Sequence, residues 1–169
     1  MNRQHLANVI AALNENQVRY LVVGGLAVVA HGVARTTLDL DLVLDLEDAN
    51  VRRAIDVLRD LGYRPMIPEP IEQFADAASR KVWINERNML AFQLKSDRMP
   101  AVPIDILVAP PFDVPGEIAR SSLREVLEGV HMPVISRDTL VRMKRDTGRP
   151  KDAIDVDYLE KLERYRDDI

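Results

Sequence analysis

The chain has 169 residues, 47% of them hydrophobic and 30% charged, and a net charge of −4. This size allows one buried core, and the acidic balance argues against a broad nucleic-acid-binding surface. The absence of cysteine excludes disulfides and thiol catalysis. Because the N-terminus lacks a signal-peptide core and no apolar stretch approaches the ~20 residues that span a bilayer, we expect a cytoplasmic protein without membrane contact.

The first part of the chain alternates helical and strand patterns. Apolar residues at helical spacing predict an amphipathic helix near the N-terminus and another that Gly62 ends. The expected elements are helices at 3–16, 26–31 and 48–61 and strands at 19–23 and 38–45. The proline-rich stretch from Arg64 to Pro70 is expected to be a loop or an irregular edge.

The second part adds strands, a hairpin and a helical end. The expected elements are a helix at 71–87, strands at 89–95 and 102–108, a hairpin over 122–135 that turns near Gly129, and helices at 137–147 and 152–165. Pro110 and Pro111 force a break after the second strand. We therefore expect an α/β (α+β) fold in one domain over 1–169, with a small mixed sheet and flanking helices at about 18–110 and a C-terminal hairpin and helices at about 120–169.

Residues 38–46 alternate leucine with other residues almost without exception. In a strand, successive side chains point to opposite faces, so the leucines share one face and Asp39 and Asp41 share the other. Their α-carbons would lie about 6.6 Å apart, close enough for both carboxylates to bind one hard cation. An edge strand with acids in water is the alternative for this segment taken alone.

Gly24 and Gly25 separate the strand at 19–23 from the helix that follows it. Two glycines let the backbone approach a ligand closely, and free N–H groups at a helix N-terminus suit a phosphate. A turn that needs a positive φ explains them equally well.

A third carboxylate, Asp105, interrupts an apolar run at 102–109. An ionised side chain there is costly unless it is paired or bound to a metal. A hydrogen bond to a loop N–H at a strand end is the alternative.

The segment 137–151 is basic within an acidic chain. It holds six basic residues and two acidic ones: Arg137, Arg142, Lys144, Arg145, Arg149 and Lys151 against Asp138 and Asp146. Such a cluster could hold a triphosphate, although a solvated helix face is favoured for Arg142 and Arg145.

Together these features resemble a known signature. Gly24-Gly25, thirteen intervening residues, Asp39-Leu40-Asp41 and a lone aspartate in a later apolar strand resemble the DNA polymerase β-like nucleotidyltransferase superfamily. The stretch from Gly24 to Leu44 is similar, more narrowly, to the bacterial abortive-infection and type IV toxin–antitoxin nucleotidyltransferase toxins. Segments 140–144 and 148–155 resemble that group's last two motifs, a lysine on a helix and an Arg-x-Lys-Asp-x-x-Asp sequence. The resemblance covers residues 18–46, 102–109 and 137–160.

The resemblance implies a mixed sheet of the nucleotidyltransferase type and a Mg²⁺-dependent transfer of a nucleoside monophosphate from an NTP to an acceptor hydroxyl, with release of pyrophosphate. It implies that Asp39, Asp41 and Asp105 are catalytic and bind the metal, with Mn²⁺ as the alternative ion, and that Lys144 is also catalytic. The nucleotide-binding residues that it implies are Gly24, Gly25, Arg35, Thr37, Lys144 and Arg149. Many superfamily members have serine where this chain has Gly25, and the segment from Arg35 to Thr37 is the alternative source of the missing contacts.

The resemblance leaves the acceptor open between RNA, a protein and a small molecule, and its toxin-like character favours RNA. It also implies a separate antitoxin protein as a partner, while the roles of Lys151, Asp152 and Asp155 stay open. A catalytically silent relative that binds a nucleotide or a partner is the main alternative. A nuclease that uses the same metal ligands is a weaker one, because the glycine pair points to a bound triphosphate.

Overall fold

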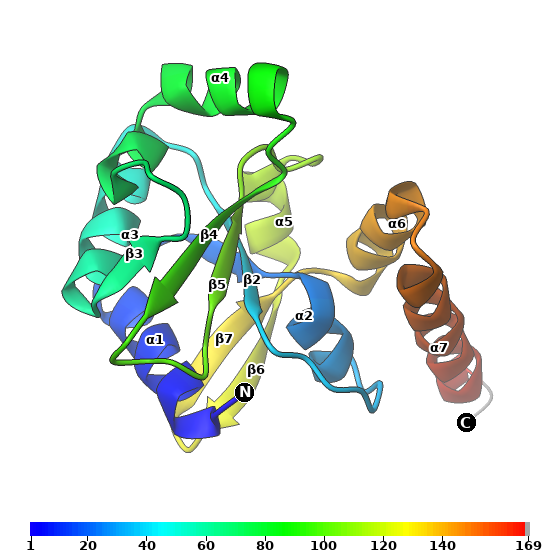
Figure 1. Cartoon of the computed structure of the whole chain (residues 1–169). Coiled ribbons are helices and arrows are strands. Elements are labelled where there is room, and N and C mark those ends of the chain that lie inside the picture. Colours follow the sequence, from blue (N-terminus) through cyan, green and yellow to red (C-terminus); the bar gives the residue numbers. More distant parts are fainter. Residues whose placement is uncertain (168–169) are drawn as a thin grey trace.

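The computed structural model describes residues 1–167, and the side chains of residues 1–164. In chain order the elements are α1 (Arg3–Glu15), β1 (Tyr20–Val22), α2 (Gly24–Ala30), β2 (Leu40–Leu44), α3 (Asp48–Asp60), β3 (Tyr63–Pro65), the 3₁₀ helix η1 (Ile71–Ala75), α4 (Ala77–Arg87), β4 (Ala91–Ser96), β5 (Ile104–Leu107), α5 (Val114–Arg120), β6 (Ser122–Leu127), β7 (Val130–Val134), α6 (Arg137–Thr147) and α7 (Pro150–Asp167) (Figure 1). No helix within the described residues is long and apolar enough to cross a membrane.

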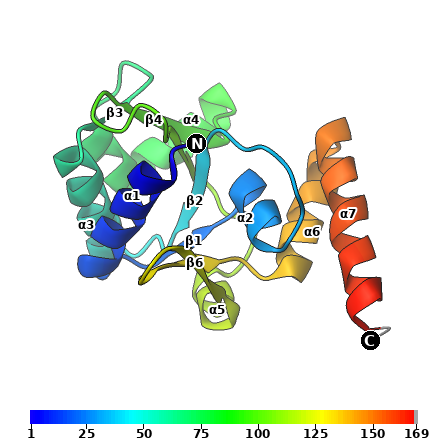
Figure 2. The ribbon, with the colours of Figure 1, turned by 90° about the horizontal axis from the view of Figure 1, so that it is seen from below.

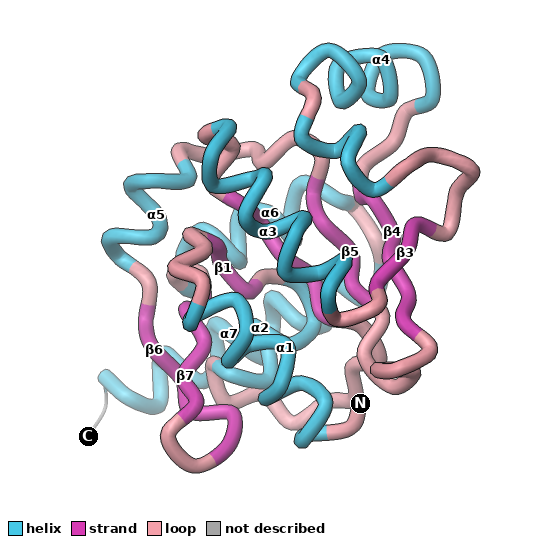
Figure 3. The backbone as a smooth tube through the Cα atoms, turned by 90° about the vertical axis from the view of Figure 1, so that its left-hand side faces the viewer, coloured by secondary structure: helices cyan, strands magenta, loops and turns pink. Residues whose placement is uncertain are grey.

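The strands form one sheet in the order β3-β4-β5-β2-β1-β7-β6. Strand β2 pairs in parallel with β5 and antiparallel with β1, so the sheet is mixed. Helices α1 and α3 lie on one side of it, and α2, α6 and α7 lie on the other (Figure 2). The expected fold class, a mixed sheet with flanking helices and a C-terminal helical segment, is confirmed. Figure 3 shows β3, β4 and β5 together at one end of the sheet.

The leucine row of β2 builds the core of the sheet. Leu40, Leu42 and Leu44 are fully buried, and so is Val43 on the opposite face, because helices cover both faces here. The strand is shorter than expected, however, since Asp39 precedes its first residue. Leu38 therefore does not join the row and is 69% exposed.

Several expected elements have other bounds. Helix α2 begins at Gly24, so both glycines form its first turn instead of a loop before it. The stretch Arg64–Pro70, expected to be a loop or an irregular edge, begins with the last two residues of the edge strand β3, which pairs with β4. The helix expected at 71–87 is divided at Asp76, whose carboxylate accepts hydrogen bonds from the N–H groups of Ala78 and Ser79 and so starts α4.

Helix α5 was not expected at all. Asp113 caps it by accepting a hydrogen bond from the Gly116 N–H, and Pro115 lies in its first turn, a position where proline suits a helix. The hairpin β6–β7 turns at Gly129, and α6 ends at Gly148, both with positive φ. The short Gly148–Arg149 connection then brings α7 back against α6.

Candidate functional site

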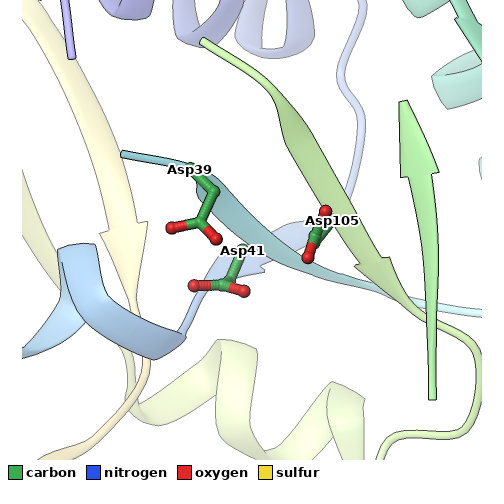
Figure 4. Close-up of side chains that lie close together, drawn as sticks. All are labelled: Asp39, Asp41 and Asp105. Atoms are coloured by element: carbon green, nitrogen blue, oxygen red, sulfur yellow. The ribbon is translucent and has the colours of Figure 1, made fainter. Parts of the chain in front are cut away.

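Three carboxylates converge where β2 and β5 lie side by side. Asp41 stands opposite Asp105 in the parallel register, and Asp39 lies at the start of β2. One carboxylate oxygen from each of the three lies within 4.8 Å of the others. Figure 4 shows the three side chains directed into the same space. A cluster of carboxylate oxygens is the ligand type that hard divalent cations prefer.

Asp41 packs against the first turn of α2. The Gly25 N–H donates a 3.3 Å hydrogen bond to Asp41 Oδ2. A β-carbon at Gly24, whose φ is +60°, would lie only 1.9 Å from the same oxygen. Only glycine therefore fits there. Burial, reinforced by the nearby charge of Asp39, raises the pKa of Asp41 to about 6 despite that hydrogen bond.

Asp105 has a polar neighbour on the next strand. Gln93 on β4 pairs with Asp105 across the antiparallel register, and its Nε2 lies 3.3 Å from each carboxylate oxygen. Burial raises the pKa of Asp105, and this amide acts in the opposite direction. Nothing in the sequence marks Gln93, because only the pairing of β4 with β5 brings it to Asp105.

Thr37 occupies the space beside the glycine turn. A β-carbon at Gly25 would lie 2.6 Å from Thr37 Oγ1 and 3.3 Å from an Arg35 nitrogen. The Thr37 hydroxyl also donates a 3.3 Å hydrogen bond to Asp39 Oδ1. The Thr37 hydroxyl thus lies in the space that the hydroxyl of a serine at position 25 would occupy.

Lys144 lies within a buried ionic network. Its Nζ lies 2.8 Å from Asp152 Oδ1 and 2.8 Å from Asp155 Oδ2, and all three residues are buried. Arg35 binds the same Asp155 oxygen at 2.5 Å. Burial acts to raise the pKa of Asp152, but hydrogen bonds from Lys144 and Thr147 outweigh it and hold that pKa below its ordinary value. The Arg-x-Lys-Asp-x-x-Asp motif therefore anchors α7 to Lys144 and to the 31–39 segment.

A cavity of about 540 Å³ collects most of the expected site residues. Its lining includes Gly24, Gly25, Arg35, Asp39, Asp41, Asp105, Lys144 and Arg149, and also Gln93, Leu90 and Lys151. Thr37 instead lines a second cavity of about 640 Å³, which shares Arg35 but contains none of the three aspartates. All three aspartates therefore lie in the smaller of these two cavities.

Some residues of the basic segment 137–151 make contacts within α6 and α7, and others line the aspartate cavity. Arg137 pairs with Glu163, Arg145 pairs with Glu160, and Arg142 donates to the Thr139 hydroxyl. Arg149 and Lys151 form no salt bridge among the described residues, and both line the cavity of the aspartates. Two cations of the basic segment that have no acidic partner among the described residues thus lie at the aspartate cavity.

Comparison with known proteins gives one family and one fold. A family model described as the nucleotidyl transferase AbiEii toxin of a type IV toxin–antitoxin system matches residues 11–168. The lincomycin-bound lincosamide antibiotic adenylyltransferase LnuA has a TM-score of 0.62 and 17% identity, over 95% of this chain and 97% of that one. ANT(2″)-Ia in complex with adenylyl-2″-tobramycin has a TM-score of 0.55 and 16% identity, over 93% of this chain and 86% of that one. These likenesses show the fold, and no curated protein matches the sequence.

Proposed function

The chain belongs to the family of nucleotidyl transferase AbiEii toxins of type IV toxin–antitoxin systems, and we propose that it transfers a nucleoside monophosphate from an NTP to an acceptor hydroxyl. The acceptor oxygen forms a bond to the α-phosphorus, the bond from that phosphorus to the bridging oxygen breaks, and pyrophosphate leaves. The observation that carries this proposal is the convergence of Asp39, Asp41 and Asp105 in one cavity with the glycine turn and with two cations that form no salt bridge within residues 1–164.

The donor set fits Mg²⁺, with Mn²⁺ as the alternative. Three carboxylates offer hard oxygen ligands. Burial, and after it the charges of Asp39 and Asp105, raise the pKa of Asp41, and a bound cation would offset these charges. Bound metal would supply charge neutralisation and activation of the attacking oxygen. Asp39, Asp41 and Asp105 would hold the metal. Asp105, on the β4–β5 side, would also accept the proton of the acceptor hydroxyl.

The remaining site residues would hold the triphosphate. We assign the first turn of α2 at Gly24 and Gly25, with the Thr37 hydroxyl and Arg35 beside it, to the phosphate oxygens. Arg149 would bind the outer phosphates, because it lines the cavity and none of the acids whose side chains the structure describes forms a salt bridge with it. Lys144 lines the same cavity as Asp41 but is held by two carboxylates, so we assign it a shared role in stabilising the departing pyrophosphate and in fixing α7.

We propose RNA as the acceptor, in keeping with the toxin family, and a separate antitoxin protein as the regulatory partner. Reaction with cellular NTPs and RNA would place the protein in the cytoplasm. Residues of the sheet and of the α6–α7 pair line the same cavity, which supports a single nucleotidyltransferase domain over 1–169.

The test supplies each of the four NTPs, labelled at the α-phosphate, with Mg²⁺ or with a chelator. Total RNA, lysate protein and an aminoglycoside and lincosamide panel serve as acceptors. We expect Mg²⁺-dependent incorporation of label with equal release of pyrophosphate, and none with Asp39→Asn. Nucleotide binding without any transfer would support the silent relative, and shortening of RNA without incorporation would support the nuclease.

A further inference from the structure

The cavity of about 640 Å³ that Thr37 lines contains none of the three aspartates. Parts of the chain that are far apart in sequence surround it: the start of α1, helix α2, the β6–β7 hairpin and residues 35–37 before β2 (Figure 2). Its volume lies within the range of about 300–1,000 Å³ that is usual for small-molecule sites. We call it the α1–α2 cavity.

Most of the residues that line the α1–α2 cavity are apolar. Buried side chains among them come from three elements: Leu6 of α1, Leu26 of α2, and Val126 and Met132 of the hairpin. Apolar ligand surface that leaves water for contact with these side chains gains free energy. The cavity therefore suits a ligand with an apolar body.

Three arginines give the α1–α2 cavity a positive charge. Its charged lining residues are Arg3, Arg35 and Arg124, together with one acid, Glu125. Glu125 follows Arg124 along β6, so its side chain points to the other face of the hairpin, where its carboxylate accepts a hydrogen bond from the turn. Arg35 pairs with Asp155, whereas Arg3 and Arg124 form no salt bridge within residues 1–164. The cavity is thus basic in a chain of net charge −4.

Arg124 points most directly to an anion as the ligand. Its partner across the hairpin is Met132, which is buried, and cross-strand partners lie on the same face of a sheet. The Arg124 Nε is buried and forms no hydrogen bond within the part of the chain that the structure describes. Buried donors in folded proteins are nearly always hydrogen-bonded. A carboxylate or phosphate oxygen, which forms strong bonds with a guanidinium, would satisfy this N–H.

The segment before β2 connects the α1–α2 cavity to the aspartate cavity. Arg35 lines both cavities. Thr37, which lines the first, lies against Gly25 and donates a hydrogen bond to Asp39. An anion that binds Arg35 from the α1–α2 cavity would compete with a triphosphate for the same guanidinium. Two ligands coupled in this way weaken each other's binding by the same factor.

We propose that the α1–α2 cavity is a regulatory site for a small amphipathic anion, a carboxylate or a phosphate ester with an apolar body, and that its occupation weakens the binding of Mg²⁺ and NTP. The anionic group binds Arg124 and Arg35, and the apolar body lies among Leu6, Leu26 and Met132. The effect on Mg²⁺ and NTP rests on the proposed function, whereas binding of the anion does not.

Calorimetric titration of the full chain with decanoate and with decyl phosphate, each below its micellar concentration, tests the site. We expect both to bind, and the tighter of the two identifies the headgroup. Decyltrimethylammonium, which reverses the headgroup charge, should bind at least about tenfold more weakly, and Arg124→Met should weaken both anions at least about tenfold through the loss of a charged hydrogen bond. Ala30→Phe, whose ring would fill part of the cavity, should weaken them while every arginine stays in place.

Arg52→Met is the matched control. Arg52 is exposed on α3 and does not line the cavity, so this variant should keep the wild-type affinity for both anions. Failure of both anions to bind the wild-type protein would overturn the site. Equal affinity for the decyl cation, or wild-type affinity in Arg124→Met or in Ala30→Phe, would overturn it as well.

The coupling is measured by titrating Mg²⁺ and an α,β-methylene NTP with and without saturating decanoate. We expect decanoate to weaken nucleotide binding at least about fivefold, and the nucleotide to weaken decanoate binding by the same factor. In Arg124→Met the same decanoate concentration should have no effect, which excludes a change in free Mg²⁺. Equal nucleotide affinity with and without decanoate, or an equal loss in Arg124→Met, would overturn the regulation. A wild-type protein that binds decanoate but no nucleotide would refute the proposed function and leave the anion site intact.

Discussion

At the scale of single residues, Asp41 shows most clearly how the fold shapes the site. It is held in a partly buried position by the backbone of α2, next to two other carboxylates. Its pKa of about 6 lies above the ordinary value of 3.8, so the folded state binds this proton more tightly than the unfolded state does. Without metal, its contribution therefore lowers stability as the pH rises from about 4 to about 6, and the full penalty is present above that range.

Asp41→Asn should consequently abolish transfer and raise the metal-free melting temperature at pH 7. Asparagine keeps an oxygen for the Gly25 N–H but carries no charge. We expect a gain on the order of 1 kcal/mol, or about 2–4 °C in Tm, and a smaller difference from wild type at pH 4. Thermal melts in a chelator at both pH values measure this. A clear loss of stability would mean that Asp41 is a structural partner instead of a metal ligand.

The close packing of Thr37 against Gly25 leads to a second prediction at the scale of single residues. Gly25→Ser should destabilise the fold, because its β-carbon would lie 2.6 Å from the Thr37 hydroxyl oxygen. Adding Thr37→Ala should recover much of the lost stability, since it removes the Thr37 oxygen. The serine introduced at position 25 then supplies a hydroxyl in its place. Denaturant melts of the two single variants and the double variant give the coupling energy, which we expect to be at least about 1 kcal/mol. Additive effects would show that the two positions do not share this space.

At the scale of elements, buried salt bridges hold helices α6 and α7 together. Lys144 binds Asp152 and Asp155, and Arg35 continues the network to the segment before β2. Breaking a buried pair by removing one partner leaves an uncompensated charge, which usually costs about 3–5 kcal/mol. The family's C-terminal motif thus has an architectural role in addition to any contact with nucleotide.

Lys144→Met should lower both stability and turnover. We expect a loss of about 3 kcal/mol because Asp152 loses the cation that binds it. Adding Asp152→Asn should recover part of this loss, because Asp155 still binds Arg35. Since the pKa of Asp152 is below its ordinary value of 3.8, this contribution is present above about pH 4 and is lost as the pH falls further. Urea melts at pH 7 and pH 3 check both statements.

Arg142→Ala is the control for this helix, because Arg142 is exposed and contacts only the Thr139 hydroxyl among the described residues. It should change stability by about 0.5 kcal/mol or less. Equal losses in Arg142→Ala and Lys144→Met would contradict the role given to the buried network.

At the scale of the whole molecule, the site lies between two parts of the chain. The aspartates and glycines come from β2 and the residue before it, from β5 and from α2, whereas Lys144, Arg149 and Lys151 come from α6, α7 and the connection between them. A nucleotide bound at the aspartate cavity would therefore join these parts, and its metal would remove the repulsion among the carboxylates.

Mg²⁺ and NTP together should accordingly stabilise the fold by more than the sum of their separate effects. A ligand at 100 times its dissociation constant adds about 2.7 kcal/mol, which a thermal melt resolves easily. The measurement compares Tm with Mg²⁺ alone, NTP with a chelator, and both together. The double variant Asp39→Asn/Asp105→Asn should lose the excess, and additive shifts in the wild-type protein would argue against a shared metal–nucleotide site.

The sequence by itself determined the elements whose signals are local. The Leu-Asp alternation placed two carboxylates beside a buried leucine row, Gly129 and Gly148 marked the turns, and the amphipathic helices had nearly correct bounds. It also identified the family, because the spacing of glycines, aspartates and C-terminal motif is itself a linear pattern. Helix α5 was missed, and the edge strand β3 was expected only as a loop or an irregular edge, because both are short and lie in proline-rich sequence, where the periodic signal is weak.

Only the tertiary structure decided which of these groups act on one another. Parallel pairing of β2 with β5 sets Asp105 opposite Asp41, and a shift of one residue would have pointed it into the core. The return of α7 against α6 gave Lys144 two acidic partners, and the long segment before β2 brought Thr37 to Gly25. These contacts join residues far apart in the chain, and a sequence pattern specifies which face a side chain occupies but not which distant strand or helix will meet that face.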